Sequence, residues 1–230
     1  MFRFKKFSVR HDSCGMKVGT DAVLLGAWVN TAGAKKILDI GTGCGVIALM
    51  LAQRTDLEVA IDAVEIEAQD AAQAAQNISE SPWPTKIAVH QKAIQEFEPG
   101  YKYDLIVSNP PFFNDSLLPP LQKRAQARHT QTLRYDELIF HSLRLLSPKG
   151  KLAVILPFRE GKQFNSLSNQ KGLFVNRQLS FSSRKEKPQE RWLFEYSMST
   201  EPIISEELVL YDSNGEKSTA YRTLTDDFYL

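Results

Sequence analysis

Short apolar runs alternate with longer segments of helical periodicity through the first two thirds of the chain. Consecutive apolar residues predict buried strands, whereas apolar residues that recur every three or four positions predict helices. This pattern predicts strands at residues 36–40, 59–65, 87–89, 103–108 and 152–156, and helices at 46–53, 67–78 and 138–146. Alternating strands and helices are typical of a mainly parallel α/β sheet, doubly wound with helices on both faces.

The pattern changes after residue 174. Strands are predicted at residues 176–183 and 191–198, and the charged segment between them has no helical pattern. We therefore expect an antiparallel hairpin at one edge of the sheet. Residues 1–30 are expected to form an N-terminal appendage, with Asp21 as the cap of a helix at 22–30. The prediction is one domain over residues 1–230, with its core at 31–200.

Composition narrows the class of protein. The 230 residues are 43% hydrophobic and 24% charged, with a net charge of +1, which excludes a disordered chain and a strongly basic one. Two cysteines do not make a disulfide scaffold, and no Cys/His spacing suggests a metal site. The sequence has neither a signal peptide pattern nor an apolar run of about 20 residues. We expect a cytoplasmic, monomeric protein without a metal.

A glycine-rich turn, DIGTGCG at residues 39–45, separates the first strand from its helix. Glycines let a ligand approach the backbone closely, and the helix N-terminus offers unpaired N–H groups. Dinucleotide sites use G-x-G-x-x-G, but counting from Gly41 the third position is Val46. The pattern resembles instead the loop of S-adenosylmethionine-dependent methyltransferases, whose ligand carries an ammonium and no phosphate. We expect Asp39, Gly41, Gly43 and Gly45 to bind this cofactor, Asp39 at its amino acid moiety.

Two further positions bear on the cofactor. Glu65 ends the second strand, 24 residues after Gly41, near the spacing at which an acid reaches ribose hydroxyls. The alternative without a functional role is that the glycines only form a tight turn and that Glu65 is a surface charge at the end of a strand. Methyltransferases of this type often place an aspartate after the third strand, to bond the adenine amino group. Here the segment reads Gln91-Lys92-Ala93, so the contact at Ala93 is expected to use backbone atoms and apolar packing.

The fourth strand runs directly into Asn109-Pro110-Pro111-Phe112. Prolines end the strand and stiffen the backbone, which places Asn109 at the carboxyl edge of the sheet, where ligands collect. The tetrapeptide resembles the [DNS]PP[FYW] motif of methyltransferases that act on amino groups conjugated to a planar system. Such an amine needs two hydrogen-bond acceptors, which the Asn109 side chain and the Pro110 carbonyl can supply. Phe112 offers a stacking face worth about 1–3 kcal/mol. These four residues are the predicted catalytic group.

The motif alone does not select the substrate, because it serves adenine, guanine and cytosine amines and also glutamine side chains. Three basic clusters favour nucleic acid, although one such cluster is more often a solvated surface. Two of them are predicted RNA-binding groups: Arg3, Lys5 and Lys6, and then Lys123, Arg124, Arg128 and His129. The third is Arg184, Lys185, Lys187 and Arg191.

Five segments together resemble a known family: MKVGTDAVLLGAW at 16–28, the glycine turn, SNPPFF at 108–113, ARHT at 127–130 and residues 224–230. The family is that of the bacterial tRNA adenine-N6 methyltransferases, which modify the adenine just 3′ of the anticodon in valine tRNA. The resemblance implies a class I methyltransferase fold with S-adenosyl-L-methionine as cofactor and tRNA as partner. It implies that Lys17, Thr20 and Asp21 lie near the cofactor and that the Arg128 segment faces tRNA.

Other functions stay open at this point. A methyltransferase of an rRNA base would use the same site, and one of protein glutamine would need a peptide groove. A non-catalytic cofactor-binding RNA module would tolerate loss of Asn109. A nicotinamide-dependent dehydrogenase is disfavoured by Val46. Trp28 and Trp192 are expected in the core rather than as stacking platforms.

Overall fold

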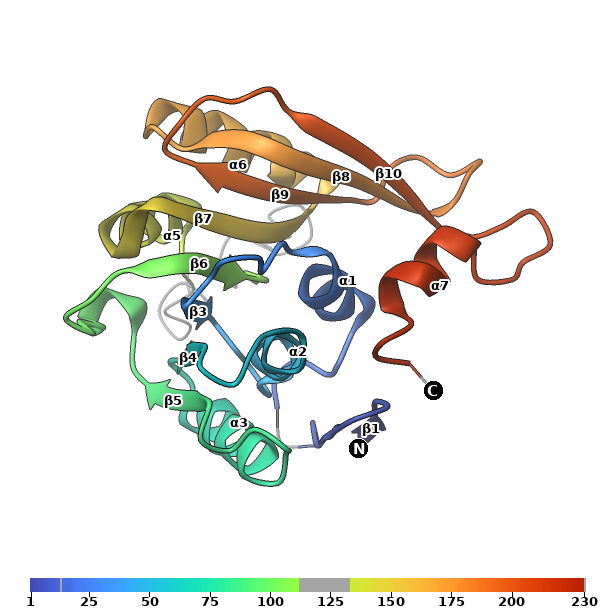
Figure 1. Cartoon of the computed structure of the whole chain (residues 1–230). Helices are drawn as coiled ribbons and strands as arrows, with labels where there is room; N and C mark the ends of the chain where they lie inside the picture. Colours follow the sequence, from blue (N-terminus) through green and yellow to red (C-terminus); the bar gives the residue numbers. More distant parts are fainter. Residues whose placement is uncertain (13, 112–132, 230) are drawn as a thin grey trace, which may run out of the picture.

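The computed structural model describes residues 1–12, 14–111 and 133–229. Most of the described chain surrounds a sheet of eight strands, in the order β10–β8–β9–β7–β6–β3–β4–β5. Figure 1 shows this sheet from β5 at the bottom of the view to β8 and β10 at the top. The strands are β3 (Lys36–Ile40), β4 (Ala60–Glu65), β5 (Ile87–Gln91), β6 (Tyr103–Ser108), β7 (Leu146–Pro157), β8 (Phe174–Arg184), β9 (Arg191–Ser197) and β10 (Ile204–Tyr211).

Helices cover both faces of the sheet. They are α1 (Thr20–Trp28), α2 (Val46–Arg54), α3 (Ala68–Ser79), the short 3-10 helix η1 (Ile94–Glu96), α5 (Tyr135–Leu145), α6 (Phe158–Gln170) and α7 (Thr219–Thr225). Successive side chains of β3 point to opposite faces of the sheet, because side chains alternate along a strand. Ile37 packs into the core that includes α1 and α2. Leu38 and Ile40 pack into the core that includes α5 and α6. This explains why the strand is apolar throughout.

The strand order reverses beside β3. β3 pairs in parallel with β4 on one side and with β6 on the other. The connections after β3 and β6 therefore leave in opposite directions, which opens a crevice at their carboxyl ends. The hydroxyl of Ser108 donates to the Ile40 carbonyl at 2.8 Å and so joins these two strand ends. The glycine turn and Asn109 follow these strand ends directly.

The expected fold class is confirmed. β9 runs antiparallel to both β7 and β8, and the other pairs of the sheet are parallel. One boundary prediction is wrong: the strand predicted at residues 152–156 already begins at Leu146, so residues 148–150 lie inside β7. The register shifts there, and a Cβ at Gly150 would lie 2.6 Å from the Tyr103 carbonyl oxygen. Because glycine has no Cβ, the strand passes this point as a bulge.

Several elements were not predicted. β10 extends the sheet beyond the hairpin and is parallel to β8. Only Leu208 of this strand is buried. The pattern of buried apolar positions along β10 is therefore weak. The two short strands β1 (Phe2–Arg3) and β2 (Ser8–Val9) form a separate hairpin. It meets the end of the described chain through a hydrogen bond from the Lys5 amide to the Phe228 carbonyl, at 2.8 Å.

The predicted cap of the first helix is wrong. α1 begins at Thr20, its N-cap is Gly19, and no side chain caps it. Asp21 therefore lies inside the first turn, and its carboxylate pairs with Arg191 instead. Within the described ranges, none of the helices has the length and apolar character needed to span a membrane.

Candidate functional site

A cavity of about 340 Å³ lies at the carboxyl ends of β3 and β6. Four parts of the chain line it: the segment from Met16 into the first turn of α1, the glycine turn with the start of α2, Asn109 and Arg191. The predicted cofactor residues Lys17, Thr20, Asp21, Gly41 and Gly43 all lie in this wall, together with Asn109. Lys17 and Asn109, which are 92 positions apart in the sequence, thus lie at one cavity.

The glycine turn lines the cavity with main-chain atoms, because Gly41 and Gly43 have no side chains. Gly41, Gly43 and Gly45 have φ values of 72°, 54° and 83°, in the left-handed region that favours glycine. A Cβ on Gly41 or Gly43 would meet no atom within 4 Å, so the space beside them is open. A Cβ on Gly45 would lie 3.4 Å from Ala74 of α3. Gly45 thus allows two helices to approach each other, and it does not line the cavity.

Glu65 supports the glycine turn. Its side chain is buried at the end of β4, where one carboxylate oxygen accepts the Gly43 amide at 2.9 Å. The other oxygen accepts the Glu67 amide at 3.0 Å. The carboxylate therefore fixes the position of the turn, although Glu65 does not itself line the cavity.

Asp39 is fully buried beneath the turn. Its Oδ2 accepts a hydrogen bond of 2.6 Å from the Thr42 hydroxyl. Burial raises the pKa of this carboxyl to about 7, although hydrogen bonds from Thr42 and the Ala48 amide oppose the shift. A cationic ligand in the cavity would stabilise the ionised form, since an opposite charge nearby lowers the pKa of a carboxyl.

Asn109 lines the cavity and has an unused hydrogen-bond acceptor. Its Oδ1 is buried, and it has no hydrogen-bond partner among the described residues. A buried polar atom without a partner is costly, so this oxygen is suited to receive an N–H from a ligand. Pro110, the next residue, is buried, and Pro111 is exposed. Phe112 lies outside the described residues.

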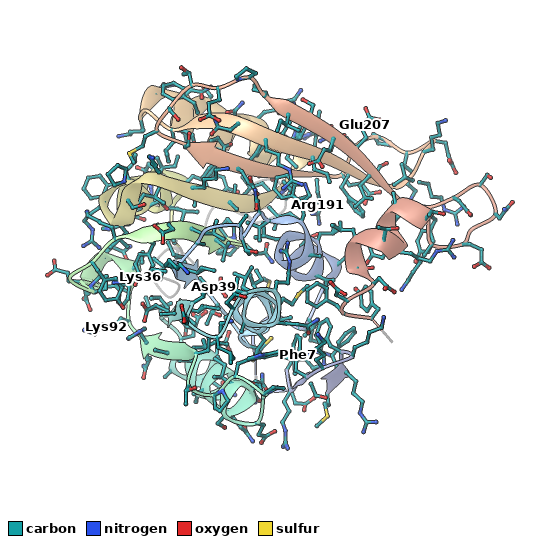
Figure 2. The ribbon with its side chains drawn as sticks, viewed as in Figure 1. Phe7, Lys36, Asp39, Lys92, Arg191 and Glu207 are labelled. Atoms are coloured by element: carbon teal, nitrogen blue, oxygen red, sulfur yellow. The ribbon has the colours of Figure 1, made fainter. Side chains whose placement is uncertain are left out.

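Arg191 lines the cavity although it is not among the predicted cofactor-binding or catalytic residues. As the first residue of β9 it lies at the carboxyl edge of the sheet, because β9 is antiparallel to β7. Its Nε donates to Asp21 Oδ2 at 2.9 Å, and its Nη1 donates to the Glu190 carbonyl at 3.1 Å. Figure 2 shows Arg191 between β9 and α1. The sequence indicated a basic cluster here, but not that one of its members reaches the cavity.

The other predicted site residues lie elsewhere. Ala93 is half-buried after β5 and does not line the cavity. Arg3 and Lys6 are exposed on the N-terminal hairpin, where Lys5 pairs with Asp226 at 3.2 Å. The second basic group, Lys123, Arg124, Arg128 and His129, lies outside the described residues. Where side chains are described, no group of His, Cys, Asp and Glu is arranged to hold a metal ion.

Comparisons with known proteins agree with this geometry. The model of the family "Methyltransferase small domain" matches residues 14–165. A protein of Pectobacterium carotovorum is 42% identical over all of this chain and 93% of its own length. One of Trichodesmium erythraeum is 44% identical over all of this chain and 97% of its own. Both are named tRNA1(Val) (adenine(37)-N6)-methyltransferase.

Solved structures share the fold. A predicted O-methyltransferase of Agrobacterium tumefaciens superimposes with a TM-score of 0.71 at 15% identity, over 90% of this chain and 96% of that one. The glycopeptide N-methyltransferase MtfA, solved with S-adenosyl-L-methionine, has a TM-score of 0.59 at 14% identity. That match covers 84% of this chain and 100% of MtfA. Both likenesses support the class I methyltransferase fold.

Proposed function

The chain belongs to the family of tRNA1(Val) (adenine(37)-N6)-methyltransferases, and on this premise we propose that it methylates N6 of adenine 37, just 3′ of the anticodon, in valine tRNA. The enzyme is an S-adenosylmethionine-dependent tRNA methyltransferase. One observation supports the proposal most strongly: Asn109 lines the cavity together with the glycine turn, and its buried Oδ1 has no hydrogen-bond partner in the described chain.

The cavity suits the cofactor. Its volume of about 340 Å³ is within the range of about 300–1,000 Å³ typical of small-molecule sites. When bound, S-adenosylmethionine supplies an activated methyl group carried on a sulfonium. We assign its direct contacts to the predicted residues that line the cavity: Lys17, Thr20, Asp21, Gly41, Gly43 and Asn109. Asp39, Gly45 and Glu65 act through the glycine turn that they support, and a backbone contact at Ala93 stays a prediction. The buried carboxyl of Asp39 provides negative charge for a cationic ligand, and the bare backbone of Gly41 and Gly43 allows close approach.

Asn109 and Pro110 orient the target amine. The Asn109 oxygen and the Pro110 carbonyl each accept one hydrogen of the adenine amino group. These two bonds direct the nitrogen lone pair toward the cavity, and Phe112 stacks on the base. The rate enhancement then comes mainly from positioning. A strong base is unnecessary, because the nitrogen can release its proton after it has been methylated.

An anticodon-loop substrate fits this arrangement. A base in a single-stranded loop is splayed out at little cost, so it can enter a cavity that a paired base could not reach. We propose that the phosphate contacts come from Arg3, Lys5 and Lys6 and from Lys123, Arg124, Arg128 and His129. We also propose that residues 1–230 act as a single methyltransferase domain and as a monomer.

A nucleoside-mapping experiment tests the function. The protein is incubated with methyl-labelled S-adenosylmethionine and an unmodified valine tRNA transcript, and with the same transcript carrying guanine at position 37. We expect labelled N6-methyladenosine from the first transcript alone. Absence of label from the first transcript would contradict the proposal, as would equal label in the transcript that carries guanine at position 37.

A further inference from the structure

An ion pair forms part of the cavity wall. The guanidinium of Arg191 and the carboxylate of Asp21 join the start of β9 to the first turn of α1, with 2.9 Å between Nε and Oδ2. Their side chains are 30% and 20% exposed, so solvent reaches both. A pair this exposed contributes only about 0–1 kcal/mol to folding stability. The contribution of this ion pair to folding stability is therefore too small to explain why it lies in the cavity wall.

Arginine at this position suits an oxygen anion. The guanidinium is planar, stays charged, and matches phosphate and carboxylate with paired N–H groups. Arg191 shares the cavity wall with Asn109, which receives the target amine in the proposed function. A nucleotide that brings its base to Asn109 must also bring its phosphates to the rim of the same cavity. The arginine can then change partners, from the Asp21 carboxylate to a phosphate.

The chain just before Arg191 is basic and exposed. Arg184 ends β8, and Lys185 and Lys187 follow in the connection to β9, all with exposed side chains. Because β8 ends and β9 begins at the carboxyl edge of the sheet, these cations lie at the same edge as the cavity. The carboxylate of Glu190 is held by the amide and hydroxyl of Ser183. Glu186 is the other acid of the connection and is exposed.

We propose that Arg191 binds a phosphate of the target nucleotide as its base enters the cavity, and that Asp21 holds the guanidinium in place beforehand. The proposal rests on the proposed function and names a residue that positions its RNA substrate. The cofactor carboxylate presents the same oxyanion chemistry. The exposed side chains of Arg184, Lys185 and Lys187, which precede Arg191 in the chain, favour the RNA phosphate as its ligand. The experiment distinguishes this phosphate from the cofactor carboxylate.

The test compares Arg191→Gln, Arg191→Lys and Asp21→Asn with the parent enzyme. Lys35→Gln serves as the charge control, because Lys35 is exposed beside the start of β3, at the opposite edge of the sheet. For each protein, the Kd of S-adenosylmethionine is measured by calorimetry, and the KM of valine tRNA is measured over a range of salt concentrations. Melting temperatures confirm that each variant is folded.

We expect Arg191→Gln to raise the KM of tRNA about tenfold, the loss that corresponds to one charge-assisted hydrogen bond. The slope of log KM against log salt should fall by about 0.7–0.9, the value for one phosphate contact. The Kd of S-adenosylmethionine should stay within about twofold. Arg191→Lys should keep most of the salt slope, and Lys35→Gln should change neither quantity.

Two results would overturn the proposal. A weaker Kd for S-adenosylmethionine with an unchanged salt slope would place Arg191 on the cofactor carboxylate. If Asp21→Asn reproduced every effect of Arg191→Gln, the pair would be a structural link, because Asp21 contributes no phosphate contact. Failure of the proposed function would appear separately, as a parent enzyme that forms no N6-methyladenosine. Equilibrium tRNA binding by the same variants would still report the phosphate contact.

Discussion

The side-chain amide of Asn77 donates a hydrogen bond of 2.8 Å to the carbonyl of Cys44 in the glycine turn. The same side chain, 1% exposed on α3, also donates to the Arg10 carbonyl at 2.8 Å and accepts the Arg10 amide at 2.9 Å. Asn77 thus fixes the glycine turn to the segment that continues into Met16 and Lys17. Both parts of the chain line the cavity, so Asn77 links two segments of its wall without lining the cavity itself.

Asn77→Ala should weaken cofactor binding as well as folding. It removes the partners of three backbone groups, and one buried unsatisfied group costs about 1–3 kcal/mol. We expect a lower melting temperature and a higher Kd for S-adenosylmethionine in calorimetry. Gln76→Ala changes the exposed neighbouring residue on α3 and should alter neither. A variant with reduced stability but the parental Kd would show that Asn77 acts on folding alone.

Asp39→Asn should change how stability depends on pH. In the folded protein burial raises the pKa of Asp39 to about 7, whereas the ordinary value is 3.8. Between these two values the folded state retains a proton that the unfolded state has released, so stability falls as pH rises toward 7. The amide that replaces the carboxyl in the variant does not titrate. The advantage of the variant over the parent should be small near pH 4, should grow as the pH rises, and should reach a few kcal/mol at pH 8.

The same substitution should have the opposite effect on cofactor binding. An ionised Asp39 attracts a cationic ligand, so parental affinity for S-adenosylmethionine should increase as pH rises through 7, with release of a proton on binding. Calorimetry in two buffers of different ionisation enthalpy measures that proton, and Asp39→Asn should abolish it. Thermal melts of the two proteins that remain parallel from pH 5 to pH 8 would disprove the shifted pKa.

Gly41→Ala should weaken cofactor binding with only a modest loss of stability. Alanine at φ +72° costs about 1–2 kcal/mol, and the new methyl group would stand in the space beside the turn. Gly33→Ala is a matched control, because Gly33 has φ +76° and open space around it but does not line the cavity. We expect similar melting temperatures and a Kd for S-adenosylmethionine at least about tenfold higher in Gly41→Ala alone. Equal Kd values would place the cofactor away from the turn.

Local signals in the sequence predicted the centre of this site. The glycine turn after β3 and the two prolines after β6 are short motifs, and the parallel sheet brings the two strand ends together. The contact between Arg191 and Asp21 joins residues 170 positions apart. It depends on the insertion of β9 between β7 and β8, which no local motif specifies. For the same reason the sequence predicts a helix cap at Asp21, whereas its carboxylate binds a distant arginine.

The most direct test of the account is the single-turnover rate at which Asn109→Ala forms N6-methyladenosine at position 37 of valine tRNA, with the Kd of S-adenosylmethionine measured in parallel. The account predicts a rate at least about 100-fold below that of the parent, because the amine loses the acceptor that orients it. It also predicts a Kd within about twofold of the parental value. A parental rate in this variant would contradict the central claim that the Asn109 oxygen orients the amine.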